Sequence, residues 1–155
     1  MEFKIPHPMQ AEHEELHHEL EAAIHSGGET GQAARKVAQA LHIHFESEEK
    51  FALPPLGLLP ALAEGKITPE MAEVFTMTDM LKAQLPHMLA EHRDIVAALE
   101  KMIEAARQEG KTEAISFAEA LMLHAQNEEE VAYPTAILIG EYLKLKLGIQ
   151  ASEQG

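Results

Sequence analysis

The amino-acid sequence predicts an all-α protein: an up-down four-helix bundle with a pseudo-two-fold repeat and a short additional helix at the C-terminus. Three observations support this class. Apolar residues recur at intervals of three and four, the spacing of one helix face. The chain contains no alternating polar and apolar run and no Asn-Gly or Asp-Gly hairpin signal. One pattern of histidine and glutamate also occurs twice, which predicts two similar helix pairs.

The first helix pair is predicted over residues 9–53. Its first helix extends from Met9 to Ser26, with apolar side chains at helical spacing, and ends at the two glycines that follow. The second helix is predicted to begin with Thr30 as its N-cap. It should end near Leu53, because two prolines come next and the residue before a proline rarely stays helical.

The middle of the chain is predicted to connect two helix pairs. Residues 54–67 are apolar but contain three prolines and two glycines, so they should form an irregular connection packed on the bundle. The second helix pair is predicted over residues 68–134, with Thr68 as a cap and a proline at the first helical position. Pro86 is expected to kink or divide the third helix.

The last part of the chain is predicted to hold the fourth helix and a terminal one. Thr112 should cap the fourth helix, and Pro134 should interrupt it. Residues 135–148 then resume as the terminal helix. Because 155 residues with 46% hydrophobic composition suit one continuous core, residues 1–155 are predicted to form a single domain.

Bulk composition limits the classes of partner. Twelve Lys and Arg stand against 26 Asp and Glu, and the resulting charge of −14 repels nucleic acid and anionic lipid, so neither is expected as a partner. The sequence has no apolar stretch of membrane-spanning length and no signal-peptide pattern, so a cytoplasmic protein is expected. Because the chain has no cysteine, nitrogen and oxygen atoms would have to hold any metal.

The repeated pattern consists of a histidine, a later His-x-x-x-Glu pair, a second glutamate and a proline. In the first half it comprises His13, His44, Glu48, Glu49 and Pro54, and in the second half His92, His124, Glu128, Glu129 and Pro134. Within each half, the offsets from the second histidine to the two glutamates and the proline are 4, 5 and 10. Chance rarely reproduces such a pattern, so its histidines and first glutamates are the candidate site.

Helical periodicity predicts that these side chains face the interior. The second helix places His44 and Glu48 in one stripe with Val37, Leu41 and Phe51. The fourth helix repeats the same steps with Phe117, Leu121, His124, Glu128 and Val131, while His13 and His92 share the apolar faces of their own helices. Ionised carboxylates are costly in an apolar interior unless a cation or a strong hydrogen-bond donor accompanies them, so the stripes predict a metal site.

The ligand chemistry favours two ions. A His and a Glu four residues apart lie about 6 Å apart on a helix face, so the imidazole can bind one ion while the carboxylate spans toward a second. Imidazole and carboxylate suit iron, manganese or zinc. The first choice is two iron ions with an oxo or hydroxo bridge. Six ligands do not fill two octahedral ions, so positions stay open for a small molecule such as dioxygen.

This repeated pattern resembles that of the hemerythrin family, in particular its HHE cation-binding branch, over about Met9 to Pro134. The family pattern is His, then His-x-x-x-Glu, repeated once. The resemblance implies iron ligation by His13, His44, Glu48, His92, His124 and Glu128. It further implies that the two glutamates bridge the metals, and that the protein binds oxygen, senses oxygen or iron, or responds to nitric oxide or peroxide.

One position departs from the oxygen-carrying members of that family. They have a fifth histidine, in a His-x-x-x-His pair on the third helix, where this chain has Val96. His17 lies four residues after His13, and by the pseudo-two-fold symmetry it is the counterpart of the missing histidine. His17 is therefore a candidate seventh ligand.

Three functions remain open from the sequence. The leading one is a binding module for a small diatomic ligand such as dioxygen, which would signal, if it signals, through a partner or a homo-oligomer. The second is a di-iron enzyme acting on peroxide or nitric oxide, which would need a proton donor near the site. Tyr133 is the sole tyrosine adjacent to the motif. The third is iron storage or buffering, which one dinuclear site per chain serves poorly.

The remaining histidines and acids have simpler interpretations. His7, His18, His25, His42 and His87 lie off the inner stripes or near helix ends and are expected to have no metal role. Glu49, Glu129 and Glu130 are expected to form a solvated face. A ferritin-like di-iron site is disfavoured, because its Glu-x-x-His spacing is not repeated on a second helix at His44, His92 or His124.

Overall fold

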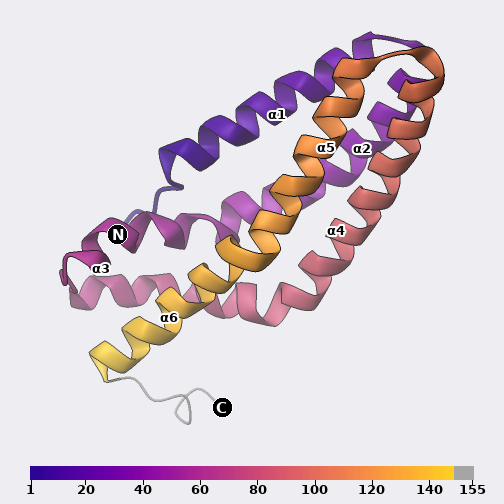
Figure 1. Ribbon diagram of the computed structural model, residues 1–155. Coiled ribbons are helices and arrows are strands. Elements are labelled where there is room, and N and C mark those ends of the chain that lie inside the picture. The colour runs from indigo at the N-terminus through magenta and orange to yellow at the C-terminus, as the bar shows by residue number, and fades with distance from the viewer. Residues whose placement is uncertain (149–155) are drawn as a thin grey trace.

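The computed structural model describes residues 1–148, and four long helices run up and down as a bundle (Figure 1). These helices are α1 (His7–His25), α2 (Gly28–Ser47), α4 (Phe75–Glu109) and α5 (Thr112–Asn127). Helix α6 (Tyr133–Leu147) continues α5 beyond the bundle. The described residues contain no strand, so the predicted all-α bundle with an additional C-terminal helix is confirmed.

The connection between the helix pairs contains more helical structure than predicted. It contains a 3₁₀ helix at Pro54–Leu58, the short helix α3 (Leu59–Ala63) and a second 3₁₀ helix at Pro69–Val74. Helix α4 then runs as one element with Pro86 inside it. Figure 1 shows α4 bending part-way along its length, which fits a kink, so the proline does not divide the helix.

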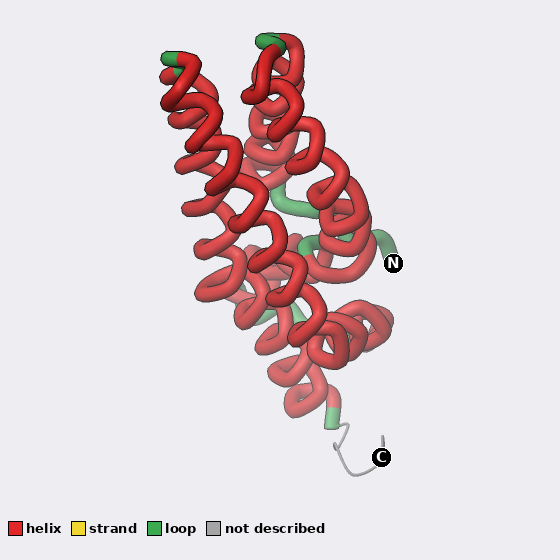
Figure 2. The backbone as a smooth tube through the Cα atoms, turned by 90° about the vertical axis from the view of Figure 1, so that its right-hand side faces the viewer, coloured by secondary structure: helices red, strands yellow, loops and turns green. Residues whose placement is uncertain are grey.

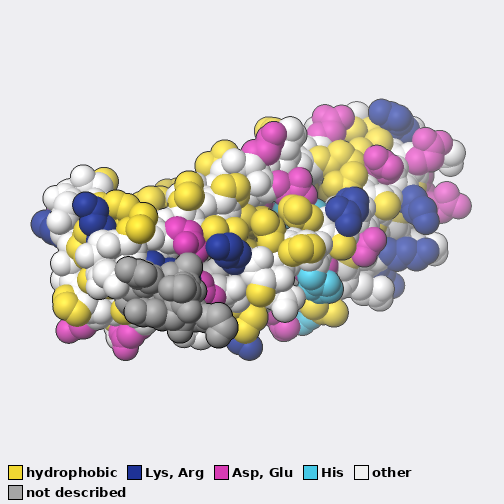
Figure 3. Space-filling model, turned by 90° about the horizontal axis from the view of Figure 1, so that it is seen from below, with side chains coloured by type: hydrophobic (Ala, Val, Ile, Leu, Met, Phe, Trp, Pro, Cys, Tyr) yellow, Lys and Arg dark blue, Asp and Glu magenta, His cyan; other side chains and the backbone are white. Residues whose placement is uncertain are grey.

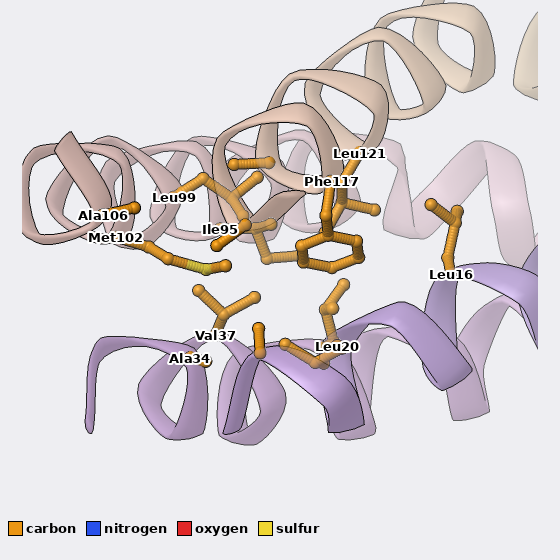
Figure 4. Close-up of a cluster of buried hydrophobic side chains, with 14 residues drawn as sticks. Leu16, Leu20, Ala34, Val37, Ile95, Leu99, Met102, Ala106, Phe117 and Leu121 are labelled. Carbon is orange, nitrogen blue, oxygen red and sulfur yellow. The ribbon is translucent and has the colours of Figure 1, made fainter. Parts of the chain in front are cut away.

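Two apolar clusters lie at different heights of the structure. In the upper cluster, shown in Figure 4, side chains from four helices pack against one another, among them Leu20, Val37, Leu99, Met102 and Phe117. The lower cluster packs the connection against α4 and α6, with Leu53, Leu81 and Leu143 fully buried. Along α2, α4 and α5 the candidate histidines and glutamates fall between members of these two clusters, so the bundle encloses a polar layer.

A π-helical turn follows the His-x-x-x-Glu pair in both halves of the molecule. These turns cover Glu48–Ala52 and Glu128–Ala132, and the first is closed by a 2.9 Å hydrogen bond that the Leu53 N–H donates to the Glu48 carbonyl. Such a turn adds one residue to the helix and rotates everything after it. The prediction that Val131 faces inward is therefore wrong: Val131 is 56% exposed, and Ala132 is buried in its place.

The two helix-pair loops lie together at one end of the bundle (Figure 2). Glu109, the last residue of α4, accepts hydrogen bonds from the backbone N–H groups of Glu29 and Thr30 and from the Thr30 hydroxyl. Lys111 donates to the carbonyls of Ser26 and Gly27. A carboxylate from another helix thus caps α2, which begins at Gly28, so Thr30 is not the N-cap that was predicted.

The surface carries no single dominant charge patch on the face shown in Figure 3, where acidic, basic and apolar side chains are interspersed. Within residues 1–148, no helix combines the length and apolar character needed to cross a bilayer.

The cap on α2 should make stability depend on pH. Its hydrogen bonds to Thr30 and Glu29 lower the pKa of Glu109 from 4.5 to about 2. The stabilisation is complete above pH 4.5 and disappears as the pH falls toward 2, because the folded state must then accept a proton. We expect Glu109→Gln to lower the melting temperature by a few degrees at pH 7, and the difference from wild type to close across this interval.

Thermal unfolding followed by circular dichroism would measure this effect. Glu100→Gln, a change at an exposed carboxylate of the same helix, is the matched control and should leave the melting temperature unchanged. A deficit in Glu109→Gln that persists unaltered at pH 2 would contradict the proposed cap.

Candidate metal centre

Each long helix contributes one buried histidine to the polar layer. His13 comes from α1, His44 from α2, His92 from α4 and His124 from α5, and the most exposed of them is 7% accessible. Glu48 and Glu128 begin the two π-helical turns and are 0% and 1% exposed. The structure therefore brings together the four histidines and the two first glutamates of the repeated pattern.

The six residues form two groups that could each hold a metal ion. The first group contains His44, Glu48, His92 and Glu128, and the second contains His13, His124 and Glu128. Within each group, one donor atom from every residue lies within 4.8 Å of the others. Glu128 belongs to both groups, so its carboxylate is the link between them.

The first group is compact. The Nε2 atoms of His44 and His92 lie 2.8 Å apart. Glu48 Oε1 is 3.1 Å from His44 Nε2, and Glu128 Oε1 is 3.2 Å from His92 Nε2. These donor atoms therefore converge on one point between α2, α4 and the two π-helical turns.

The second group is more open. The Nε2 atoms of His13 and His124 lie 3.1 Å apart. Glu128 Oε2 is 3.1 Å from His124 Nε2 and 3.6 Å from His13 Nε2. Glu128 thus directs one oxygen to each group, as expected of a bridging carboxylate, whereas Glu48 contacts only the first group.

Unpaired carboxylate oxygens show that a cation suits this layer. Among residues 1–148, no hydrogen-bond donor satisfies Glu48 Oε1, Glu48 Oε2 or Glu128 Oε2, although all three are buried. Leaving such atoms unpaired in an apolar interior costs several kcal/mol. Imidazole nitrogen and carboxylate oxygen are ligands of iron, manganese and zinc, so the donor set fits the predicted class of metals.

Outer carboxylates orient three of the four imidazoles. The Nδ1–H group of His44 donates to Glu91 and that of His92 to Glu129, both at a distance of 3.0 Å. The Nδ1–H group of His124 donates to Glu12. Holding the hydrogen on Nδ1 turns the Nε2 lone pair toward the centre, which is how proteins prepare histidine for metal. His13 is positioned differently, by stacking on Phe45 at 4.4 Å between ring centroids.

Sequence reasoning missed these outer partners. Glu129 was assigned to a solvated face, but it binds His92 and is only 37% exposed. The available signal was the repeat itself, because a glutamate immediately precedes both His13 and His92. Each of these glutamates orients a histidine of the other helix pair: Glu12 serves His124, and Glu91 serves His44.

The two central acids differ in pKa. Burial raises the pKa of Glu48 well above its ordinary value, and the negative charge of Glu128 raises it further. Burial also opposes ionisation of Glu128, but the adjoining Glu48 carboxyl and the imidazoles of His124 and His13 outweigh it, so the pKa of Glu128 is lowered. Without a metal, the layer therefore favours the neutral form of Glu48 and the ionised form of Glu128.

The histidines respond to the same environment. Burial lowers the pKa of His44, although its hydrogen bond to Glu91 opposes this shift. Burial also works against protonation of His124, but Glu128 and Glu12 raise its pKa overall. The protonated form of His124 and the ionised form of Glu128 thus favour each other when no cation is bound.

His17, the candidate seventh ligand, lies away from both groups. Its side chain is 68% exposed and its Nε2 is 3.5 Å from Glu21. One full helical turn separates it from His13, and it belongs to neither group of converging donor atoms. With His13 and Phe45 it lines a cavity of about 340 Å³ at the edge of the bundle.

A tyrosine is the other unpredicted neighbour of the layer. Tyr133 is fully buried, and its hydroxyl lies 3.1 Å from His44 Nε2 and 3.2 Å from His92 Nε2. Sequence reasoning noted only its proximity to the motif. Its orientation depends on the π-helical turn before it, which the sequence pattern does not reveal.

Comparisons with protein-family models, curated proteins and solved structures found no match to this chain.

Proposed function

We propose that the protein is a dinuclear iron protein that reversibly binds or senses dioxygen or a related small molecule. The observation that carries this proposal is the set of buried, unpaired carboxylate oxygens facing converging imidazole nitrogens in an apolar interior. A cation in each group would satisfy these atoms, and Glu128 would connect the two ions through its two oxygens.

Iron is proposed over manganese and zinc for two reasons. The donor set of nitrogen and oxygen suits a redox-active ion with open positions, and it lacks the thiolates of most structural zinc sites. The order of the six ligands also resembles the hemerythrin pattern, which implies iron. When bound, the ions would supply the reversible electron exchange with dioxygen that side chains alone do not provide.

The second group is the proposed place for the small molecule. Only three protein donors converge there, against four in the first group. The cavity lined by His17 and Phe45 reaches His13, which gives a path from the surface to this side of the layer. The apolar clusters above and below would limit the entry of water.

An enzyme acting on peroxide or nitric oxide is the second candidate. The observation in its favour is a buried hydroxyl at the centre, because the phenol of Tyr133 lies 3.1 Å from His44 Nε2, where it can donate a proton. Storage or buffering of iron would use the same residues, but a single dinuclear layer gives it little capacity.

A spectroscopic oxygenation experiment separates these functions. Metal content is measured first, and the iron-loaded protein is then reduced and exposed to air while visible absorption is followed. A stable spectrum that reverses when oxygen is removed supports a carrier, and irreversible oxidation points to a sensor or enzyme. Sustained turnover of added peroxide favours catalysis. Protein that takes up no iron would refute the proposed function.

Removing one imidazole from each group should abolish metal binding. We expect His44→Ala with His124→Ala to lose bound metal, and with it the stabilisation of about 2.7 kcal/mol that a ligand provides at 100 times its Kd. Elemental analysis and thermal unfolding with and without metal measure both effects. The control is His42→Ala with His18→Ala, two exposed imidazoles outside the layer. Unchanged metal content in the first variant would reject the ligand set.

Metal binding should also release protons. Because burial raises the pKa of Glu48, a cation must displace its proton, so apparent metal affinity should rise with pH across the interval between the ordinary value and the raised one. Titration of weakly buffered protein with metal counts these protons directly. Glu48→Gln, which has no such proton, should bind metal more weakly and release fewer. Equal proton release by both proteins would contradict this assignment.

A further inference from the structure

The phenol of Tyr133 lies at ligand distance from the first group. Its oxygen is 3.1 Å from His44 Nε2 and 3.2 Å from His92 Nε2, and these nitrogens are 2.8 Å apart. Neighbouring ligands of an octahedral ion with bonds of about 2.1 Å are about 3 Å apart. The three atoms therefore have the spacing of one face of a coordination octahedron.

Hydrogen bonding within the protein does not account for this triangle. His44 and His92 each donate an Nδ1–H to a carboxylate. In a neutral imidazole, a hydrogen on Nδ1 leaves only a lone pair on Nε2. The phenol has one hydrogen, for which the two nitrogens and the Glu48 carboxyl compete. The Nε2 lone pairs of His44 and His92 then face each other and repel, and a cation between them would remove this repulsion.

The second group has no counterpart of this phenol oxygen. Tyr133 lies five residues after Glu128, directly after the π-helical turn. The residue at the same offset from Glu48 is Leu53, which is fully buried and apolar. The phenol is thus a feature of one side only, and it makes the two groups chemically unequal.

We propose that Tyr133 is a protein ligand of the ion held by His44, Glu48, His92 and Glu128, bound through its phenolate oxygen. This inference rests on the proposed function, since it requires a metal in the first group. Ligation breaks the phenol O–H bond, forms the oxygen–metal bond and releases the proton to solvent without any change of oxidation state. The first ion then has five protein donors and the second has three, which directs small molecules to the second.

Phenolate bound to Fe(III) gives an intense charge-transfer band in the visible region and characteristic tyrosinate modes in resonance Raman spectra. The chain has two tyrosines, so Tyr133→Phe can be matched with Tyr142→Phe, a change at a 38% exposed ring. The three proteins are loaded with iron, assayed for iron per chain and oxidised. We expect the band and the modes in wild type and Tyr142→Phe, and their loss in Tyr133→Phe with iron still bound.

Failure of this inference is distinguishable from failure of the proposed function. If wild-type protein binds iron but shows no tyrosinate modes, or if Tyr133→Phe retains them, Tyr133 is not a ligand. If wild-type protein binds no iron, the proposed function itself fails. Zinc loading gives a readout independent of iron: ultraviolet difference absorption at pH 7 should report one ionised tyrosine per chain in wild type and Tyr142→Phe, and none in Tyr133→Phe. Its absence in zinc-loaded wild type would also overturn the assignment.

Discussion

The structure depends on the burial of two carboxylates and four imidazoles inside an apolar bundle. Such a layer is unfavourable unless opposite charge balances it, and in the metal-free protein the raised pKa values of Glu48 and His124 lessen the net negative charge. The other features follow from that constraint. Two apolar clusters keep water from the layer, the π-helical turns place its acids, and outer glutamates fix the direction of its imidazoles.

The fold and the six central residues could be predicted because both depend on periodicity along single helices. His44 and Glu48 continue the stripe of Val37 and Leu41, and a second copy of the pattern makes coincidence improbable. The predicted direction of side chains fails where a π-helical turn changes the number of residues per helical turn. A π-helical turn leaves no mark in a hydrophobic pattern, so Val131 was assigned to the interior although it is exposed.

Contacts between helices could not be predicted from local pattern. Glu109 caps a helix that begins about 80 residues earlier, and Glu12 binds a histidine more than 100 residues later. Only the packing of the helix pairs brings such partners together. The same limit applies to Tyr133, whose direction depends on the turn before it and on the position of α2 and α4.

Two of the three outer glutamates cross between the halves of the chain: Glu12 orients a histidine of the second helix pair and Glu91 one of the first, whereas Glu129 orients His92 within the second pair. A helix pair expressed alone would therefore lack the acid that orients His44 or the acid that orients His124. Two copies of one such pair, related by a rotation axis, would supply each other with the missing acids. This reciprocity ties the two copies of the motif to each other, because each copy supplies an acid that a histidine of the other needs.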